Sequence, residues 1–108
     1  MNKFPGIFLL AFITATTACG GESANLEQSV QERTESKPET APDYFLEQIE
    51  AGATVEEQAI YLYGIGLAHE KLGNIEEAVN DYLGAEILGY APATQALQRV
   101  RDKIGKDL

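Results

Sequence analysis

From residue 43 onward, apolar residues recur at the spacing of a helix face, and glycines interrupt the pattern at Gly52, Gly73 and Gly89. Glycine is the residue most often found just past the C-terminus of a helix. The pattern therefore predicts helices over about residues 43–51, 54–72 and 74–89, and a fourth that begins near residue 92 and runs toward the end of the chain. The predicted fold class is all-α, with about four helices.

Polar residues at the predicted helix starts support these boundaries. Thr54 is followed three residues later by Glu57, and Asn74 is followed in the same way by Glu77, which is the spacing of a capping box. Pro92 falls in the first turn of the fourth helix, where its missing N–H costs no hydrogen bond. The third and fourth helices each have one apolar face, formed by Ile75, Ala78, Val79 and Tyr82 and by Ala93, Ala96, Leu97, Val100 and Ile104.

The predicted second helix differs from its neighbours because it is apolar nearly all round between Ala59 and Ala68. A helix of this kind has neighbours on more than one side. Gly64 and Gly66 lie in its middle, and each costs about 1 kcal/mol of helix propensity relative to alanine. We therefore expect a neighbouring helix to pack closely against these glycines.

A weak internal repeat indicates stacked pairs of helices. Asp43-Tyr44-Phe45 returns as Asp81-Tyr82-Leu83, and Gln58-Ala59-Ile60 returns as Gln95-Ala96-Leu97, at offsets of 38 and 37 residues. A period of this size is typical of helix-turn-helix solenoids.

Over residues 59–97 the chain resembles the tetratricopeptide repeat (TPR), and more closely its Sel1-like variant. The matching positions are Leu62, Ile65, Gly66, Gly73, Ala78, Tyr82, Ala85, the run Gly89-Tyr90-Ala91-Pro92-Ala93 and Leu97. The resemblance implies a short helix-turn-helix α-solenoid over residues 43–108 that binds a protein through its concave surface. It also implies that Tyr63, Leu67, Glu70 and Lys71 are exposed partner-binding positions. The alternative is that Tyr63 and Leu67 belong to the core.

The first 18 residues have the three parts of a bacterial export signal. Lys3 supplies the positive charge, an unbroken apolar run covers residues 7–13, and small residues follow up to Ala18. Cys19, the single cysteine, comes next, and the segment resembles a lipoprotein signal peptide. The resemblance implies that Cys19 carries fatty-acyl chains such as palmitate and, with Gly20 following, that they anchor the protein in the outer membrane, facing the periplasm. The alternative is cleavage after Ala18, which would leave a soluble periplasmic protein.

Between Cys19 and residue 42, only Leu26 and Val30 are larger apolar residues, and polar residues dominate. Such a composition cannot bury enough surface to offset its ordering entropy, which predicts a lipidated N-terminus followed by a disordered linker over residues 19–42. About 23 residues of flexible coil have an r.m.s. span of about 25–30 Å. A short helix over residues 25–33 is the alternative, but nothing obvious in the sequence would pack against it.

Removal of residues 1–18 leaves 7 basic and 17 acidic residues, a net charge of −10. This charge argues against nucleic acid as a partner. Ten acids and one base, Lys71, lie between Asp43 and Glu86. We expect these acids to solvate the surface; the alternative is an acidic face that selects a basic protein partner. A folded part of this size has a small core, so partner docking or self-association would add burial.

Catalytic and metal-binding residues are scarce. The serines and Cys19 lie outside the predicted helical domain, and His69 is the single histidine, so neither a Ser or Cys nucleophile nor a histidine-based metal cluster is predicted. We expect a non-enzymatic interaction module of the bacterial envelope, with no metal or cofactor. The alternatives are an assembly or escort lipoprotein for a secretion or pilus system, and a soluble periplasmic accessory subunit.

Overall fold

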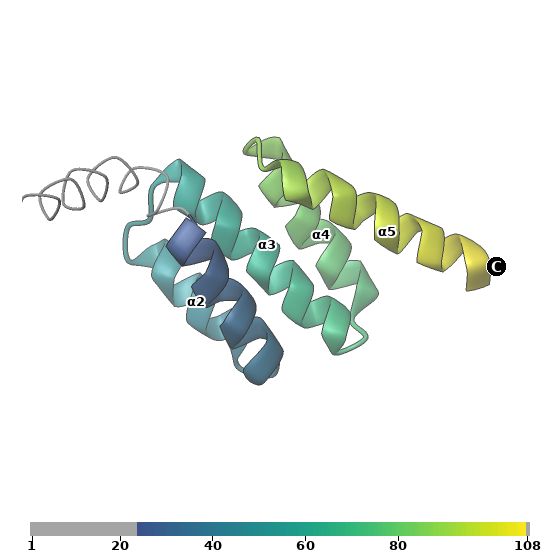
Figure 1. Cartoon of the computed structure of the whole chain (residues 1–108), viewed down its shortest axis with the longest axis horizontal. Helices are drawn as coiled ribbons and strands as arrows, with labels where there is room; N and C mark the ends of the chain where they lie inside the picture. Colours follow the sequence, from purple (N-terminus) through teal and green to yellow (C-terminus); the bar gives the residue numbers. More distant parts are fainter. Residues whose placement is uncertain (1–23, 108) are drawn as a thin grey trace, which may run out of the picture.

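The computed structural model describes residues 24–107; the predicted signal peptide, Cys19 and residues 20–23 lie outside the described residues. Within the described range the fold is all-α, as predicted, and short turns join successive helices (Figure 1). The four predicted helices are α2 (Ala41–Glu50), α3 (Val55–Lys71), α4 (Ile75–Ile87) and α5 (Ala91–Asp107). Residues 24–36 are also helical, and we call this segment helix 24–36.

The predicted capping box at the start of α3 is confirmed. The Glu57 N–H donates to Thr54 Oγ1 at 3.2 Å, and the Thr54 N–H donates to Glu57 Oε1 at 2.9 Å. Asn74 occupies the N-cap position of α4 as predicted, but its side chain makes no capping hydrogen bond. Its Nδ2 instead lies 3.4 Å from His69 Nδ1, so the side chain is turned back toward α3.

The ends of α3 and α4 agree with the glycine pattern. Gly73 follows α3 with φ 85°, and Gly89 follows α4 with φ 93°, a left-handed conformation that residues with a Cβ rarely adopt. These conformations reverse the chain, so that α3 lies between α2 and α4, and α5 packs on α4 (Figure 1). The expectation that α3 has neighbours on several sides is confirmed.

The two glycines in the middle of α3 allow this close packing. A Cβ on Gly64 would lie 2.4 Å from Val30 Cγ1 and 2.9 Å from Phe45 Cε2, and a Cβ on Gly66 would lie 2.6 Å from the Tyr82 ring. Contacts this short exclude a methyl group without movement of the neighbours. Glycine lowers the helix propensity at these positions, and the close contact that it allows with helix 24–36, α2 and α4 offsets this loss.

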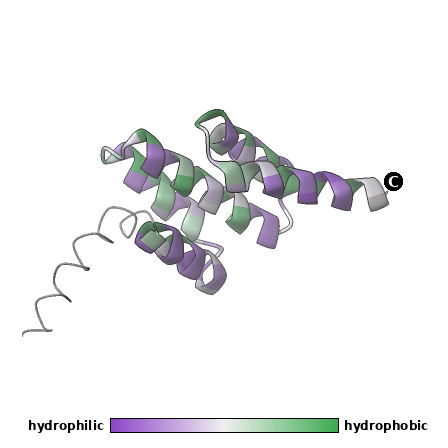
Figure 2. Cartoon of the chain, turned by 45° about the horizontal axis from the view of Figure 1, so that its top comes forward, coloured by the Kyte–Doolittle hydropathy of each residue, from purple (hydrophilic) through white to green (hydrophobic). Residues whose placement is uncertain are grey.

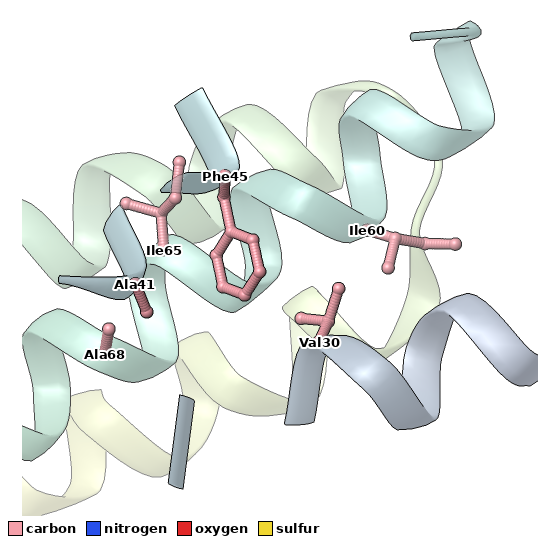
Figure 3. Packing of buried hydrophobic residues seen from close by; sticks show 6 residues of the cluster. All are labelled: Val30, Ala41, Phe45, Ile60, Ile65 and Ala68. Carbon is pink, nitrogen blue, oxygen red and sulfur yellow. The ribbon is translucent and has the colours of Figure 1, made fainter. Parts of the chain in front are cut away.

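The buried side chains form two clusters on opposite sides of α3. The first joins helix 24–36, α2 and α3, and the Val30 side chain lies between those of Phe45 and Ile60 (Figure 3). The second joins α4 and α5, with Tyr63 and Leu67 of α3 packed against it. Its fully buried centre includes Tyr82 and Val100.

The prediction of a disordered linker over residues 19–42 is wrong for residues 24–42, which form helix 24–36, a turn and the start of α2. Val30 is only 2% exposed, and Thr34 is buried and donates a long 3.5 Å hydrogen bond to the Gly64 carbonyl. The other faces of the helix are hydrophilic (Figure 2). The segment is ordered because Leu26, Val30 and Thr34, at four-residue intervals, form a narrow stripe that fits against α3.

Candidate partner-binding groove

A groove of about 400 Å³ opens between helix 24–36, α3 and α5. All four partner-binding residues that the sequence predicted lie on it. Its lining consists of Gln31, Thr34 and Glu35 from helix 24–36, Tyr63, Leu67, Glu70 and Lys71 from α3, and Arg99 and Lys103 from α5.

The apolar floor of the groove consists of Tyr63 and Leu67, which are half-buried. The Tyr63 ring packs against Tyr82 and Tyr90, with centroid distances of 5.6 and 5.3 Å. Burial raises the pKa of the Tyr63 hydroxyl, so it stays protonated. Both predicted readings of these residues apply in part, because one side of each packs on the core and the other side faces the groove.

Glu70 is the centre of an ionic network across the groove, so the prediction that it is an exposed contact position is wrong. Its side chain is only 11% exposed. Glu70 Oε1 accepts hydrogen bonds from the Tyr82 hydroxyl and from Arg99 Nη2, each at 2.7 Å. Glu70 Oε2 accepts from Lys103 Nζ at 3.2 Å and, more weakly, from Arg99 Nε at 3.4 Å.

These partners determine the charge state of Glu70. Burial alone raises the pKa of the carboxyl, but hydrogen bonds from Arg99, Tyr82 and Lys103 outweigh burial and lower the pKa to about 2. Burial and the hydrogen bond to Glu70 raise the pKa of the Tyr82 hydroxyl. Glu70 is therefore an anion and Tyr82 a neutral donor around neutral pH.

The sequence prediction missed the residues that α5 and helix 24–36 contribute to the groove. Arg99 and Lys103 are one helical turn apart on α5, a spacing that places two cations on one face. The sequence shows that spacing, but it does not show that both cations contact Glu70 of α3. Gln31 and Thr34 were missed because their segment was assigned to the linker.

A second groove of about 390 Å³ lies between α2, α3 and α4. Three acids line it, Asp43, Glu77 and Asp81, together with His69 and Asn80. Its apolar floor consists of Pro42, Leu46, Leu62 and Ile65. Burial raises the pKa of the Asp81 carboxyl, although His69, with Nε2 3.9 Å from Asp81 Oδ2, opposes the rise. Part of the acidic charge that the sequence shows between residues 43 and 86 gathers here.

Among residues 24–107, no group of three or more His, Cys, Asp and Glu side chains is placed to hold a metal ion. None of the helices in the same range is both long and apolar enough to span a bilayer. No protein-family model, curated protein or solved structure matches the chain. The resemblance to TPR and Sel1-like repeats therefore stays a prediction.

Proposed function

We propose that the protein is a non-catalytic protein-interaction module, anchored in the bacterial outer membrane by lipid on Cys19 and facing the periplasm. A segment of its partner binds in the groove between helix 24–36, α3 and α5. The observation that carries this proposal is the composition of the groove, an apolar floor of Tyr63 and Leu67 inside a charged rim. Protein-binding surfaces commonly combine an apolar, aromatic centre with a polar rim.

The charge of this groove favours an acidic partner segment. Three cations, Lys71, Arg99 and Lys103, line it against two acids, Glu35 and Glu70. Both Glu70 oxygens already accept hydrogen bonds, while the Arg99 and Lys103 side chains remain 47% and 57% exposed. The uncompensated charge is positive in an otherwise acidic protein, which steers carboxylates toward the groove.

A basic partner, which the overall charge suggests, would bind the second groove instead. The second groove combines the apolar Leu46 and Leu62 with three acids and suits a segment that carries lysine or arginine beside apolar residues. It is the second candidate because none of the four predicted partner-binding residues lines it.

Site-specific photo-crosslinking in cells tests the proposal. A photoreactive residue at Gln31, on the rim of the groove, is expected to capture a protein that mass spectrometry identifies. The same residue at Gln95, which is exposed on α5 away from the groove, is the matched control. Equal capture at both positions would contradict a partner site in the groove.

The identified partner segment then allows a measurement of affinity. Lys71→Glu reverses a charge on the rim of the groove, whereas Lys37→Glu reverses an exposed charge that does not line it. We expect Lys71→Glu to weaken binding about tenfold, equivalent to about 1.4 kcal/mol, and Lys37→Glu to have little effect. An affinity that Lys71→Glu leaves unchanged would rule out an acidic segment in this groove.

Lipid attachment is tested separately by metabolic palmitate labelling. The wild-type chain is expected to incorporate label and Cys19→Ala is not. Equal labelling of the two chains would refute the lipid anchor.

A further inference from the structure

The described chain begins at one particular end of the helical bundle. Ala24 lines a pocket of about 290 Å³ together with Ile60, Tyr90 and Pro92, and the Tyr90 hydroxyl donates a hydrogen bond to Glu27. Tyr90 belongs to the α4–α5 turn, and Ile60 lies in the second turn of α3. Residue 24 is therefore at the end of the bundle that carries the α2–α3 and α4–α5 turns, and the α3–α4 turn is at the opposite end (Figure 1).

The chain between Cys19 and this end is short. Only residues 20–23 separate Cys19 from Ala24, so the two Cα atoms are at most about 18 Å apart when five residue steps are fully extended. The linker predicted from the sequence would have allowed an average distance of about 25–30 Å. Because helix 24–36 is docked on α3, a lipid on Cys19 holds this end of the bundle close to the bilayer.

The same end carries the two most exposed large apolar side chains among the described residues. Ile87, the last residue of α4, is 81% exposed, and Val55, the first residue of α3, is 55% exposed. Leu88 follows Ile87 in the α4–α5 turn and is also exposed. Single exposed apolar residues are common on protein surfaces. Here, however, they gather at the end that the short spacer directs toward the membrane.

We propose that Val55, Ile87 and Leu88 form a membrane-contacting surface that enters the interfacial layer of the bilayer. This inference rests on the proposed lipidation of Cys19. The occupant is a zwitterionic phospholipid surface, because Glu56 and Glu57 lie in the first turn of α3 beside Val55 and would be repelled by anionic headgroups. The contact fixes the orientation of the bundle, so that the partner groove, whose residues Glu70 and Lys71 lie near the α3–α4 turn, is directed away from the membrane.

Tryptophan fluorescence in vesicles tests this surface. The chain contains no tryptophan, so Ile87→Trp and Val55→Trp each introduce a single probe. Leu72→Trp, at an exposed position beside the α3–α4 turn, is the matched control at the opposite end. The chain from Cys19 onward is coupled through its Cys19 thiol to a maleimide lipid in phosphatidylcholine vesicles that contain brominated acyl chains.

We expect the emission at positions 87 and 55 to shift to shorter wavelength and to lose most of its intensity, while the emission at position 72 changes little. Insertion of ten Gly and Ser residues between Ser23 and Ala24 lowers the effective concentration of this end at the bilayer about fivefold, and should restore most of the emission of Ile87→Trp. Equal quenching at positions 87 and 72, or no quenching at either, would overturn the proposal. Unchanged quenching after the insertion would overturn the role of the short spacer.

The vesicle experiment and palmitate labelling test the two proposals separately. The chemical coupling supplies the anchor whether or not cells lipidate Cys19, so an absence of quenching refutes the membrane-contacting surface alone. An absence of label in cells refutes the lipid anchor of the proposed function.

Discussion

The ionic network around Glu70 can be tested by removal of a single charge. Glu70→Gln preserves the length of the side chain and an oxygen that can accept the Tyr82 hydroxyl, but it removes the negative charge that Arg99 and Lys103 contact. We expect the variant to be less stable than the wild type near neutral pH. We also expect the difference to disappear in acid, where Glu70 itself becomes protonated.

The magnitude follows from the change in the pKa of Glu70 on folding. The pKa falls from 4.5 to about 2, and at about 1.36 kcal/mol per pKa unit this corresponds to at most about 3.4 kcal/mol. Arg99 and Lys103 are about half exposed, so solvent screening reduces the value to about 2 kcal/mol. For a domain of roughly 60–100 residues, such a loss lowers Tm by about 10 °C.

The pH dependence has a definite sign. Since folding lowers the pKa of Glu70, its stabilisation is complete above the unfolded value of 4.5 and is lost as pH falls toward 2. Urea unfolding followed by circular dichroism at a series of pH values measures this loss for wild type and Glu70→Gln. The difference between their free energies of unfolding should be about 2 kcal/mol near neutral pH and close to zero at the acid end of the series.

Glu35→Gln is the control, because Glu35 lines the same groove but is exposed. It should leave the free energy of unfolding nearly unchanged at every pH. A difference between wild type and Glu70→Gln that stays constant with pH would refute the assignment of the stabilising charge to Glu70.

Further substitutions test the packing and the helix ends. Gly64→Ala would place a Cβ 2.4 Å from Val30 and should destabilise the fold by about 1–3 kcal/mol in urea. Gly84→Ala, with its nearest neighbour at 3.4 Å, should be neutral or stabilise by up to about 1 kcal/mol; equal effects would contradict close packing at Gly64. Val30→Ala should accelerate amide hydrogen exchange over residues 24–36 more than in α4, and uniform acceleration would argue against separate docking of helix 24–36. Thr54→Ala should cost about 1 kcal/mol and Asn74→Ala much less in thermal unfolding, because only Thr54 makes capping hydrogen bonds; similar losses would contradict that assignment.

The helix boundaries in the C-terminal part of the chain were predictable because local chemistry determines them. A glycine with positive φ, such as Gly73, ends a helix wherever the neighbouring helices lie. The capping box of Thr54 and Glu57 requires only four consecutive residues. Asn74 occupies the predicted N-cap position, but its side chain contacts His69, five residues earlier, and makes no capping hydrogen bond.

Helix 24–36 was not predictable in the same way, because its stability comes from a distant segment. A helix of this length is marginal in water on its own, and Leu26, Val30 and Thr34 form a stripe that includes only two large apolar residues. The sequence does not show that this stripe packs against the surface at Gly64, which lies 30 residues beyond Thr34 in the chain. The glycines of α3 indicated that a neighbour would pack there, but not which segment it would be.

The predicted partner-binding residues share one face of α3 because Tyr63, Leu67 and Glu70 follow helical spacing, and that placement needed only the periodicity of the sequence. The environment of the face depends on α5. Arg99 and Lys103 lie 29 and 33 residues beyond Glu70 and convert a predicted exposed acid into the acceptor of an internal network. Sequence spacing could place these residues, but it could not show that their charges were already paired.

The network still leaves hydrogen-bond donors for the acidic partner segment that we propose. A lysine ammonium has three donors and an arginine guanidinium has five. Lys103 makes one hydrogen bond to Glu70, and Arg99 makes two to Glu70 and a third, at 3.4 Å, to the Tyr82 hydroxyl. A partner carboxylate can therefore bind the remaining donors, together with Lys71, without displacing Glu70. This distinction matters energetically, because displacement would leave the Glu70 carboxylate partly buried without its cations, and an unpaired buried charge is far more costly than a shared one. The charge of Glu70 thus holds Arg99 and Lys103 in the groove, and in the proposed complex the partner binds the N–H donors of these two side chains that Glu70 does not accept from.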